Sequence, residues 1–569
     1  MKNSEVSNIL RETAKLLEIK GDNPFRIRAY ERAAQNIEGL NEDIENLIRE
    51  ARLTGIPGIG NDLADKIKEI VTTGSLKTYA ELKKDLPEGI LELLDIPSVG
   101  PKTARMLYEK LNIGNIQELE GAIEKHKLQG VYGIKEKTVE NILKGIGIIK
   151  RGRERMTLAE ALQTADKFIR VLEKNSGVKK ISSAGSLRRF KETVRDIDIL
   201  ISSDNPKEIM DIFIKLSPGA EILAKGATKS SIRTKNDVQI DCRVVTKESF
   251  GAALLYFTGS KNFNIKLRQL AIKKGLKINE YGIFKNEKII AGRTEEEIFK
   301  ALGIDYIEPE LREDTGEIEL AQTFNLPKLV ELNQIKADLH MHSRWSDGKN
   351  SIEEIAAACQ KRGYAYAGIT DHSQSLKVAK GLTTADLRKK RDEIEKINRK
   401  LSGFRVLYGA EVDIDSQGNL DYNDGILKEL DFVIAAIHTG FKQSRQQLTR
   451  RVIKACENKY VHVIAHPTGR LWGIRDAYDI DLEEILKAAK QTNTALEINS
   501  YPQRLDLNDL NCRKAKEMGV KISLGSDAHN TGQLEAIKFG VSMARRGWIA
   551  NDDVLNTLTC DELLKTIKK

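Results

Sequence analysis

The fold of the central part of the chain is decided by the stretch Ala184–Leu200, which reads AGSLRRFKETVRDIDIL. Asp196 and Asp198 are two residues apart on an expected strand, so both carboxylates face the same way. A third carboxylate, Asp241, lies in a second expected strand over residues 238–245 that can pair alongside. Three carboxylates on one sheet face form an oxygen cage for two Mg²⁺ or Mn²⁺ ions. Such a cage, with a bound triphosphate, permits attack of a 3′-hydroxyl on the α-phosphate.

The same stretch offers a place for phosphate groups. Gly185 and Ser186 form an expected tight turn whose backbone N–H groups and hydroxyl can hold phosphate oxygens, and Arg189 adds positive charge there. An isolated Asp-x-Asp pair is weak evidence, because many such residues are exposed or cap helices. A Gly-Ser turn, then Asp-x-Asp, then a later strand aspartate is far more specific for nucleotidyl transfer.

Working outward, we expect helices over residues 157–174 and 206–216 and a strand over 180–184, the elements of an α+β palm. This order resembles the nucleotidyltransferase superfamily. Downstream, the sequences LYFTGSKNFN (255–264) and KINEYGI (277–283) resemble the thumb of family X DNA polymerases, the DNA polymerase beta group.

The resemblance to that thumb implies roles for individual residues. Tyr256, Phe257 and Gly259 would flank the sugar of the incoming nucleotide, and Asn264 and Arg268 would lie near the nascent base pair and the template. The alternative for the Tyr256–Phe257 pair is simple core packing. Two further positions depart from the family pattern: Lys261 replaces an aspartate and Gln239 replaces an arginine. These two replacements leave the rate and the fidelity of nucleotide incorporation undetermined, but they do not affect the carboxylate cage.

Three glycine turns precede this region, and each joins two expected short helices; they span residues 54–60, 94–100 and 128–134. They resemble helix-hairpin-helix motifs, in which backbone N–H groups at a helix start contact a DNA phosphate without reading sequence. The residues expected to contact DNA here are Gly58, Gly60, Gly100 and Lys102, with Lys135 and Lys137 in support. The alternative is an ordinary helix cap.

Residues 23–34 also resemble the small N-terminal domain of family X polymerases, in which a helix lysine forms a Schiff base with a 5′-deoxyribose phosphate. Lys66 occupies the matching place. A Schiff base needs a neutral amine, and the neighbouring Asp62 and Asp65 work against a lowered pKa. We therefore expect Lys66 to be a solvated helix lysine and not the lyase nucleophile.

The C-terminal part of the chain alternates apolar strands with helices, the pattern of a parallel sheet or barrel. Six of the eight histidines and several carboxylates stand at the ends of these strands, where a βα barrel brings side chains together. Imidazole nitrogens and carboxylate oxygens are ligands of zinc and manganese. The alternative, that each histidine is a satisfied core residue, is reasonable for one histidine and poor for six.

At these residues the chain resembles the polymerase and histidinol phosphatase (PHP) family. The resemblance implies a distorted (βα)7 barrel, two to three Zn²⁺ or Mn²⁺ ions and a metal-dependent hydrolase. The implied ligands are His340, His342, Asp347, His372, Glu411, His438, His466, Asp527 and His529. Arg344 and Arg470 lie near these motifs and are candidates to bind phosphate, with surface roles as the alternative.

Composition agrees with a multidomain protein that binds a polyanion. The 569 residues are 40% hydrophobic and 31% charged, with a net charge of +9 and a surplus of basic residues between 101 and 300. No apolar run is long enough for a membrane span or a signal peptide, and the five cysteines are scattered. We expect a cytoplasmic, monomeric protein with no membrane partner.

Together these features predict a helical helix-hairpin-helix N-terminal part, an α+β palm and thumb, and a PHP barrel. The expected boundaries are 1–85 (lyase-like), 86–150 (fingers-like), 151–248 (palm), 249–315 (thumb), 316–335 (linker) and 336–569 (PHP).

The predicted function is a DNA polymerase that fills short gaps in base excision or end repair. Its partners would be gapped or nicked DNA and dNTPs. The PHP domain would supply a 3′-5′ exonuclease, with AP endonuclease and 3′-phosphodiesterase activities besides. Two rivals stay open: a small-molecule phosphatase tethered to DNA, and a DNA-end binding scaffold with a silent polymerase half.

Overall fold

The computed structural model describes residues 3–568, except 39–43, 57, 97–98, 129–130, 132–133 and 135. The chain divides into two compact units. The first contains residues 1–153 with the short segment 473–475, and the second contains residues 154–472 with 476–569. Within the described residues, no helix combines the length and the apolar character needed to cross a membrane.

The first unit is helical and is built on one hydrophobic cluster that extends from Val6 to Ile149. Amphipathic helices contribute one apolar face each to this cluster, so the expected boundary at residue 85 does not separate two cores. The helices are α1 (Asn3–Lys20), α2 (Pro24–Glu38), α3 (Ile44–Arg49), α4 (Asn61–Thr73), α5 (Lys77–Asp85), α6 (Pro101–Leu111), α7 (Ile116–Glu124) and α8 (Glu136–Glu154).

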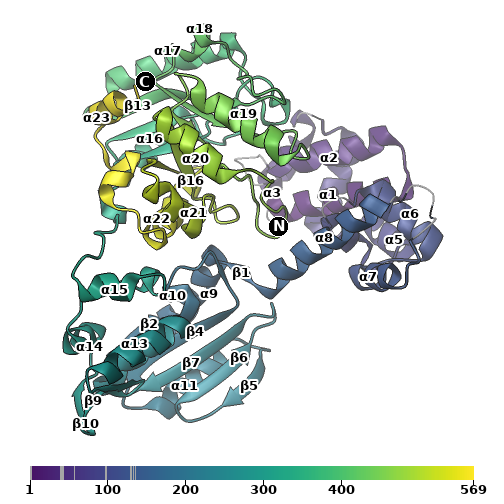
Figure 1. Ribbon diagram of the computed structural model, residues 1–569. Helices are drawn as coiled ribbons and strands as arrows, with labels where there is room; N and C mark the ends of the chain where they lie inside the picture. Colours follow the sequence, from purple (N-terminus) through teal and green to yellow (C-terminus); the bar gives the residue numbers. More distant parts are fainter. Residues whose placement is uncertain are drawn as a thin grey trace. The chain divides into compact units, whose positions relative to one another are not determined.

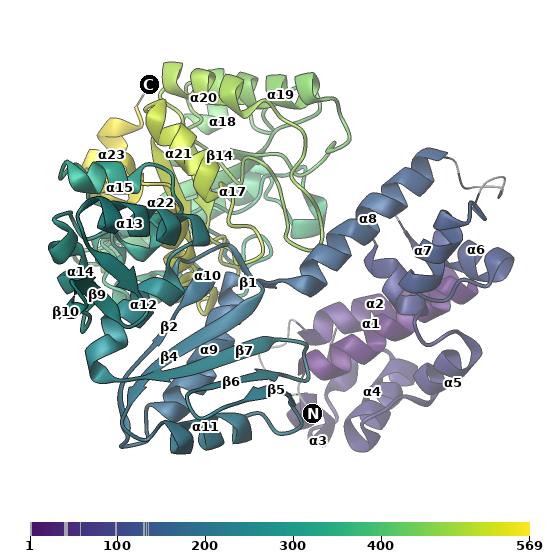
Figure 2. The ribbon, with the colours of Figure 1, turned by 60° about the horizontal axis from the view of Figure 1, so that its bottom comes forward.

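The palm is a five-stranded mixed sheet with the order β2-β4-β7-β6-β5, and its strands lie side by side in Figure 2. The strands are β2 (Val178–Ser183), β4 (Asp196–Ser203), β5 (Glu221–Lys225), β6 (Lys229–Arg233) and β7 (Gln239–Val245). The isoleucines of β4 pack on one face against α9 (Leu158–Leu172) and α11 (Pro206–Lys215). Because side chains alternate along a strand, Asp196 and Asp198 belong to the opposite face.

The thumb packs two helices, α12 (Phe250–Thr258) and α13 (Lys261–Lys273), with a small three-stranded sheet and α14 (Glu295–Leu302). The sheet consists of β8 (Lys277–Asn279), β9 (Gly282–Lys285) and β10 (Lys288–Ala291). The expected linker over residues 316–335 is wrong at its start. Residues 317–322 form α15 (Glu317–Gln322), whose Ile318 and Ala321 are buried in the thumb cluster. The acidic composition of this segment suggested a linker, and for that reason the short amphipathic helix was not predicted.

The C-terminal part is a parallel barrel of seven strands in sequence order, which confirms the predicted (βα)7 architecture (Figure 1). The strands are β11 (Ala337–Met341), β12 (Tyr366–Ile369), β13 (Arg405–Asp413), β14 (Phe432–Ala436), β15 (Val463–Ile464), β16 (Ala495–Asn499) and β17 (Ile522–Gly525). Past the strand ends, the backbone N–H groups of Asp527 and His342 donate to the carbonyls of His340 and Ala528, each at 2.9 Å, and bring the last strand to the first.

Helices surround the barrel and close one end of it. They are α16 (Ile352–Lys361), α17 (Thr384–Lys400), α18 (Asp424–Leu427), α19 (Arg445–Glu457), α20 (Leu482–Gln491), α21 (Asp509–Glu517), α22 (Ile537–Arg546) and α23 (Cys560–Thr566). Leu563 of α23 packs against Ala337 and Tyr366, the first residues of their strands. This covers the amino end of the barrel and leaves the carboxyl end for the candidate ligands.

A buried ion pair joins the carboxyl end of β12 to the middle of β13. Lys390 of α17 is fully buried, and its Nζ donates to the carbonyls of Ile369 and Gly409, each at 3.0 Å. The same Nζ lies 2.8 Å from the carboxylate of the buried Asp371. Asp371 in turn accepts hydrogen bonds from Ser343 and Ser346, in the turn between two candidate ligands.

We expect Lys390→Met to lower the free energy of unfolding by about 3–5 kcal/mol, because it leaves Asp371 as a buried charge without its partner. Urea unfolding followed by circular dichroism measures this. Lys389→Met is the matched control, since Lys389 lies on the same helix with an exposed side chain. Equal stability of the two variants would contradict the proposed importance of the pair.

Candidate functional site

The three palm aspartates meet on one face of the sheet. Strands β4 and β7 are parallel neighbours, and their register sets Asp198 directly beside Asp241 and Asp196 beside Gln239. The amide of Gln239 donates to the carboxylate of Asp241 at 3.3 Å. The alternation of β7 buries Ile240 and Cys242 in the core and leaves Asp241 on the opposite face. The sequence spacing therefore gave the correct face for this carboxylate pair.

Burial, together with the proximity of the three carboxylates, raises the pKa of one of them, Asp198. Burial raises the pKa of Asp198, and the neighbouring carboxylates of Asp196 and Asp241 raise it further, to about 7. Arg243 and Lys229 act in the opposite direction but do not outweigh these causes. A carboxylate that resists ionisation because of like charges nearby is suited to a divalent cation, which would remove the repulsion.

The Gly-Ser turn lies against this cluster. Gly185 has φ +61°, which favours glycine, and a Cβ added to it would lie 2.2 Å from Oδ2 of Asp198, so a larger residue would strain the turn and displace this carboxylate. Ala184 donates its N–H to the carbonyl of Asp198 at 2.9 Å, which fixes the turn to β4. Ser186 follows in the short helix α10 (Gly185–Arg188) and is half-buried. The backbone here thus approaches the carboxylates closely.

Arg189 was expected to add free charge beside this turn, and the structure shows it bonded to the thumb. Its Nη1 donates to the carbonyls of Thr258 and Gly259 at 2.6 and 3.1 Å, and its Nε donates to Glu313 at 3.0 Å. Its side chain is only 11% exposed. Sequence reasoning missed these partners because they lie about 70 and 124 residues away along the chain.

The thumb residues expected near the nucleotide form one connected group. Phe257 meets Tyr256 edge-on with ring centres 5.1 Å apart, and the guanidinium of Arg243 lies 4.4 Å from the centre of the Phe257 ring. Asn264 donates to the carbonyl of Tyr256 at 2.7 Å, and Arg268 donates to the carbonyl of Asn264 at 3.2 Å. Their contacts with a nucleotide stay predictions.

Two glycines in the N-terminal turns leave free space at the first residues of the helices that follow them. Gly60 and Gly100 are the N-cap residues of α4 and α6, and a Cβ at either position would meet nothing within 4 Å. Gly58 has φ +80°, which favours glycine. Lys102, in the first turn of α6, is exposed. Lys135 lies outside the described residues, as do parts of all three turns.

Lys66 was expected to be a solvated helix lysine, and the structure shows it paired and largely enclosed, with its side chain 19% exposed. Its absence from lyase chemistry stays a prediction. Its Nζ lies 2.5 Å from the carboxylate of Asp62 and 5.4 Å from the ring centre of Tyr30. Partial burial lowers the pKa of Lys66, but the hydrogen bond and charge of Asp62 outweigh it and hold this pKa above its ordinary value. The amine is therefore protonated at neutral pH.

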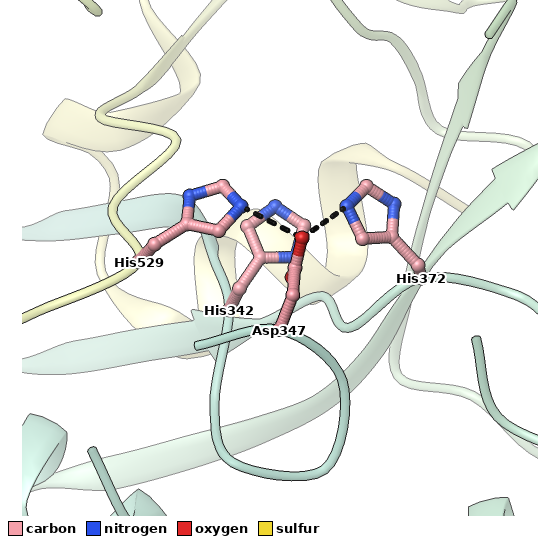
Figure 3. A group of neighbouring side chains, drawn as sticks. All are labelled: His342, Asp347, His372 and His529. Atoms are coloured by element: carbon pink, nitrogen blue, oxygen red, sulfur yellow. Dashed lines mark ion pairs between the residues drawn. The ribbon is translucent and has the colours of Figure 1, made fainter. Parts of the chain in front are cut away.

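At the barrel's carboxyl end, the nine predicted PHP ligands converge. Eight of them form three overlapping groups whose ligand atoms lie within 4.8 Å of one another: His342, Asp347, His372 and His529; His340, His342 and Asp527; and His372, Glu411 and His438. The ninth, His466, joins them through Glu411, with its Nε2 2.9 Å from a carboxylate oxygen. Figure 3 shows Asp347 between the rings of His529 and His372. The strand-end pattern therefore identified residues that come together in space.

Two further carboxylates orient these histidines and were missed by sequence reasoning. Glu497 lies 2.6 Å from Nδ1 of His340, and Asp413 lies 2.5 Å from Nδ1 of His438. Carboxylates behind ligand histidines fix the ring orientation and raise its basicity. A signal was present, because Asp413 follows Glu411 by two residues on the same strand and so shares its face.

The site contains buried nitrogen and oxygen atoms without hydrogen-bond partners among the described residues, and a divalent cation could bind to them. The buried Nε2 of His340, Nδ1 of His342 and Oε2 of Glu411 have no hydrogen-bond partner among the described residues. Burial, together with the neighbouring rings of His372 and His529, lowers the pKa of His342 to about 4, so its ring is neutral, as a ligand requires. Glu411 is held ionised: burial opposes this, but the surrounding histidines keep its pKa well below the ordinary value.

The two arginines expected near phosphate have other roles. Arg470 lies 2.7 Å from Glu192 of the palm and donates to the carbonyl of Arg504 at 2.7 Å. Arg344 is half-exposed and donates to the carbonyl of Lys349. Arg504, which sequence reasoning did not select, lies 3.5 Å from the carboxylate of Asp527.

Comparisons with known proteins agree with this arrangement. Family models match residues 1–76 (helix-hairpin-helix domain), 90–147 (SAM-like helix-hairpin-helix tandem), 253–313 (DNA polymerase beta thumb) and 338–501 (PHP domain). The DNA polymerase/3′-5′ exonuclease PolX of Bacillus subtilis (strain 168) is 40% identical over 573 residues, which covers 100% of both chains. The chain belongs to the family X DNA polymerases with a C-terminal PHP domain. The family expected from sequence is thereby confirmed.

Other relatives match parts of this family X chain. DNA polymerase lambda of Rattus norvegicus is 27% identical over 344 residues, 55% of this chain and 56% of its own length. A probable phosphatase of Thermoanaerobacter sp. (strain X514) is 35% identical over 231 residues, 39% of this chain and 89% of its own length.

The raised pKa of Asp198 in this family X palm predicts how the melting temperature depends on pH. The raised pKa of Asp198 means that ionising it destabilises the metal-free fold, and this cost grows as pH rises from about 4 to above 7. In EDTA, we expect Asp198→Asn to raise the melting temperature at pH 8 and to raise it less at pH 5. Differential scanning fluorimetry measures both values. Asp166→Asn, at an exposed palm carboxylate, is the control. An equal gain at the two pH values would contradict the like-charge explanation.

Proposed function

We propose that this chain fills short gaps in DNA by adding dNTPs to a primer 3′-hydroxyl, and that it works in base excision or end repair. The observation that carries the proposal is the set of Asp196, Asp198 and Asp241 on one face of the palm sheet beside the Gly185 turn. The name of the Bacillus subtilis relative, a DNA polymerase/3′-5′ exonuclease, supports it.

The palm residues suit this reaction. Asp196, Asp198 and Asp241 would hold two Mg²⁺ or Mn²⁺ ions, which neutralise charge on the triphosphate and activate the attacking oxygen. Asp241 accepts the proton of the primer 3′-hydroxyl. The new bond joins this oxygen to the α-phosphorus, and the bond from the α-phosphorus to pyrophosphate breaks. Gly185 and Ser186 bind phosphate oxygens, and the N-terminal glycine turns bind the DNA backbone on gapped or nicked substrates.

The PHP barrel is proposed to act as a 3′-5′ exonuclease, with cleavage at abasic sites and removal of 3′ blocks as further activities. Its nine ligands would hold two to three Zn²⁺ or Mn²⁺ ions, which supply an activated water for attack on the terminal phosphodiester. Glu497 and Asp413 keep His340 and His438 oriented. The charges of Glu411 and Asp527 make the cluster a strong cation site.

A second candidate function for the barrel is the hydrolysis of small phosphate esters, because the Thermoanaerobacter relative is named a probable phosphatase. Release of inorganic phosphate from histidinol phosphate, without shortening of DNA ends, would favour it. A DNA-end binding scaffold is disfavoured by the complete aspartate set.

For synthesis, we expect Asp241→Asn to slow primer extension by at least about a thousandfold, since it removes both a metal ligand and the base. The measurement is a gel assay of a 5′-labelled primer on one-nucleotide-gapped DNA with Mn²⁺ and dNTPs. Asp237→Asn, at an exposed turn beside the same strand, should extend as the wild type does. Undiminished extension by Asp241→Asn would remove the proposed role of this carboxylate.

For degradation, we expect the double change His340→Ala and His342→Ala to abolish shortening of the same primer in Mn²⁺ without dNTPs and to lower the bound metal, measured by mass spectrometry. Primer extension should persist, because the palm cluster is untouched. His126→Ala, at an exposed histidine of the first unit, is the control. Shortening at the wild-type rate by the double variant would exclude the barrel as the nuclease.

A further inference from the structure

Two arginines of the PHP domain, one buried and one partly buried, hold one short segment of the palm. The segment is residues 188–192, between the Gly-Ser turn and the strand of the catalytic aspartates. At its start, Nη1 of Arg546 donates to the carbonyl of Arg189 at 2.7 Å. At its end, Nη2 of Arg470 lies 2.7 Å from the carboxylate of Glu192. The barrel therefore contacts the polymerase half within a few residues of its phosphate-binding turn.

Arg546 is almost completely enclosed, with a side-chain exposure of 2%, and it is anchored within its own domain. Its Nε and Nη2 both donate to Asp509, at 2.9 and 2.5 Å. Such a two-point contact fixes the plane of a guanidinium. The remaining nitrogen, Nη1, is thereby aimed at the polymerase half, where it reaches Arg189 and Glu313.

Glu313 connects the barrel arginine to the palm arginine. One of its oxygens, Oε1, receives Nη1 of Arg546 at 3.1 Å and Nε of Arg189 at 3.0 Å, with Nζ of Lys191 at 3.4 Å. Burial raises the pKa of Glu313, but the three cations outweigh it and keep the carboxylate ionised. Charged hydrogen bonds in a partly buried site are strong and directional.

The result is that Arg189 is held by two of its three guanidinium nitrogens. Nη1 donates to the carbonyls of Thr258 and Gly259, and Nε donates to Glu313. The structure gives Nη2 no hydrogen bond to any described residue. The guanidinium thus has one nitrogen left for a ligand, in an orientation set by the thumb and, through Glu313, by the barrel.

We propose that Arg546 of the PHP domain is a positioning residue for nucleotide incorporation: with Glu313, it fixes Arg189 so that the free nitrogen of this arginine binds the incoming triphosphate. The inference rests on the proposed polymerase function and adds that the barrel has a second task, unrelated to its metals. On this proposal the network that holds Arg189 is complete only with the PHP domain attached.

The same helix supplies a matched control. Arg545, next in sequence, also crosses from the barrel to the thumb, and its Nε lies 2.6 Å from Glu310. It contacts neither Glu313 nor Arg189 in the described structure. Arg545→Met and Arg546→Met each remove an ion pair across the same boundary. Arg546→Met also removes the pair with Asp509 inside the barrel, and only this variant disturbs the hold on Arg189.

The test is steady-state dNTP incorporation by the full-length chain on one-nucleotide-gapped DNA. We expect Arg546→Met to raise KM for dNTP by about tenfold or more, the loss typical of a charged hydrogen bond, with a smaller change in kcat. Arg545→Met should keep KM within about twofold of the wild type. Exonuclease rate and bound metal should be unchanged in both, because neither arginine contacts a PHP ligand.

A second variant distinguishes a loss of positioning from a folding defect of Arg546→Met. Glu313→Gln removes the charge that links the two arginines and should raise KM in the same way. Combined with Arg546→Met, it should add little, because both act on one interaction. A normal KM in both single variants, or equal increases in Arg545→Met and Arg546→Met, would overturn the inference while leaving gap filling intact. No extension by the wild type would overturn both.

Discussion

Both catalytic centres depend on one constraint, the concentration of ionisable groups in a place with little water. In the palm, three carboxylates share a sheet face, and burial with mutual repulsion raises the pKa of Asp198 to about 7. In the barrel, buried acids and imidazoles share one end, and some histidines gain protons while others lose them. Without cations the ionisation of Asp198 destabilises the palm, so the palm fold must be strong enough elsewhere to keep its carboxylates together. In the barrel the acids and several of the histidines favour each other's charged forms, but the whole cluster must still be held out of water.

In the barrel, a fully buried ion pair stabilises the segment that carries two of the candidate ligands. Lys390 compensates Asp371, and Asp371 holds the serine turn that leads from His342 to Asp347. Two ligand positions also carry unfavourable backbone conformations, since His466 has φ +28° and Asp527 has φ +54°. Non-glycine residues adopt such angles at a cost, and they persist at functional sites where the surroundings enforce them. The candidate ligand positions at His466 and Asp527 are therefore set by the scaffold and not by local preference.

Sequence alone predicted the residues whose position follows from local periodicity. The aspartates of β4 share a face because they are two residues apart, and the barrel ligands converge because parallel strands end together. What it missed depends on contacts between distant segments. Glu497 reaches His340 across 157 positions, and Arg189 bonds to Glu313 across 124. No spacing rule encodes these pairs. The helix α15 was missed because it has only six residues, fewer than two turns, and an acidic surface.

The buried arginines between barrel and palm show why domain fusion matters here. A guanidinium buried without partners would be strongly unfavourable, so Arg546 needs Asp509, Glu313 and the carbonyl of Arg189 together. Each half also pairs its own charges, Glu313 with Arg189 and Arg546 with Asp509, and the boundary joins the two pairs into one network. A separate phosphoesterase barrel has no reason to keep such an arginine at its surface, whereas a barrel that supports a nucleotide site has. Two of these contacts, from Arg546 to the carbonyl of Arg189 and from Arg470 to Glu192, reach the segment that follows the turn at Gly185, and this places the influence of the barrel beside the nucleotide site.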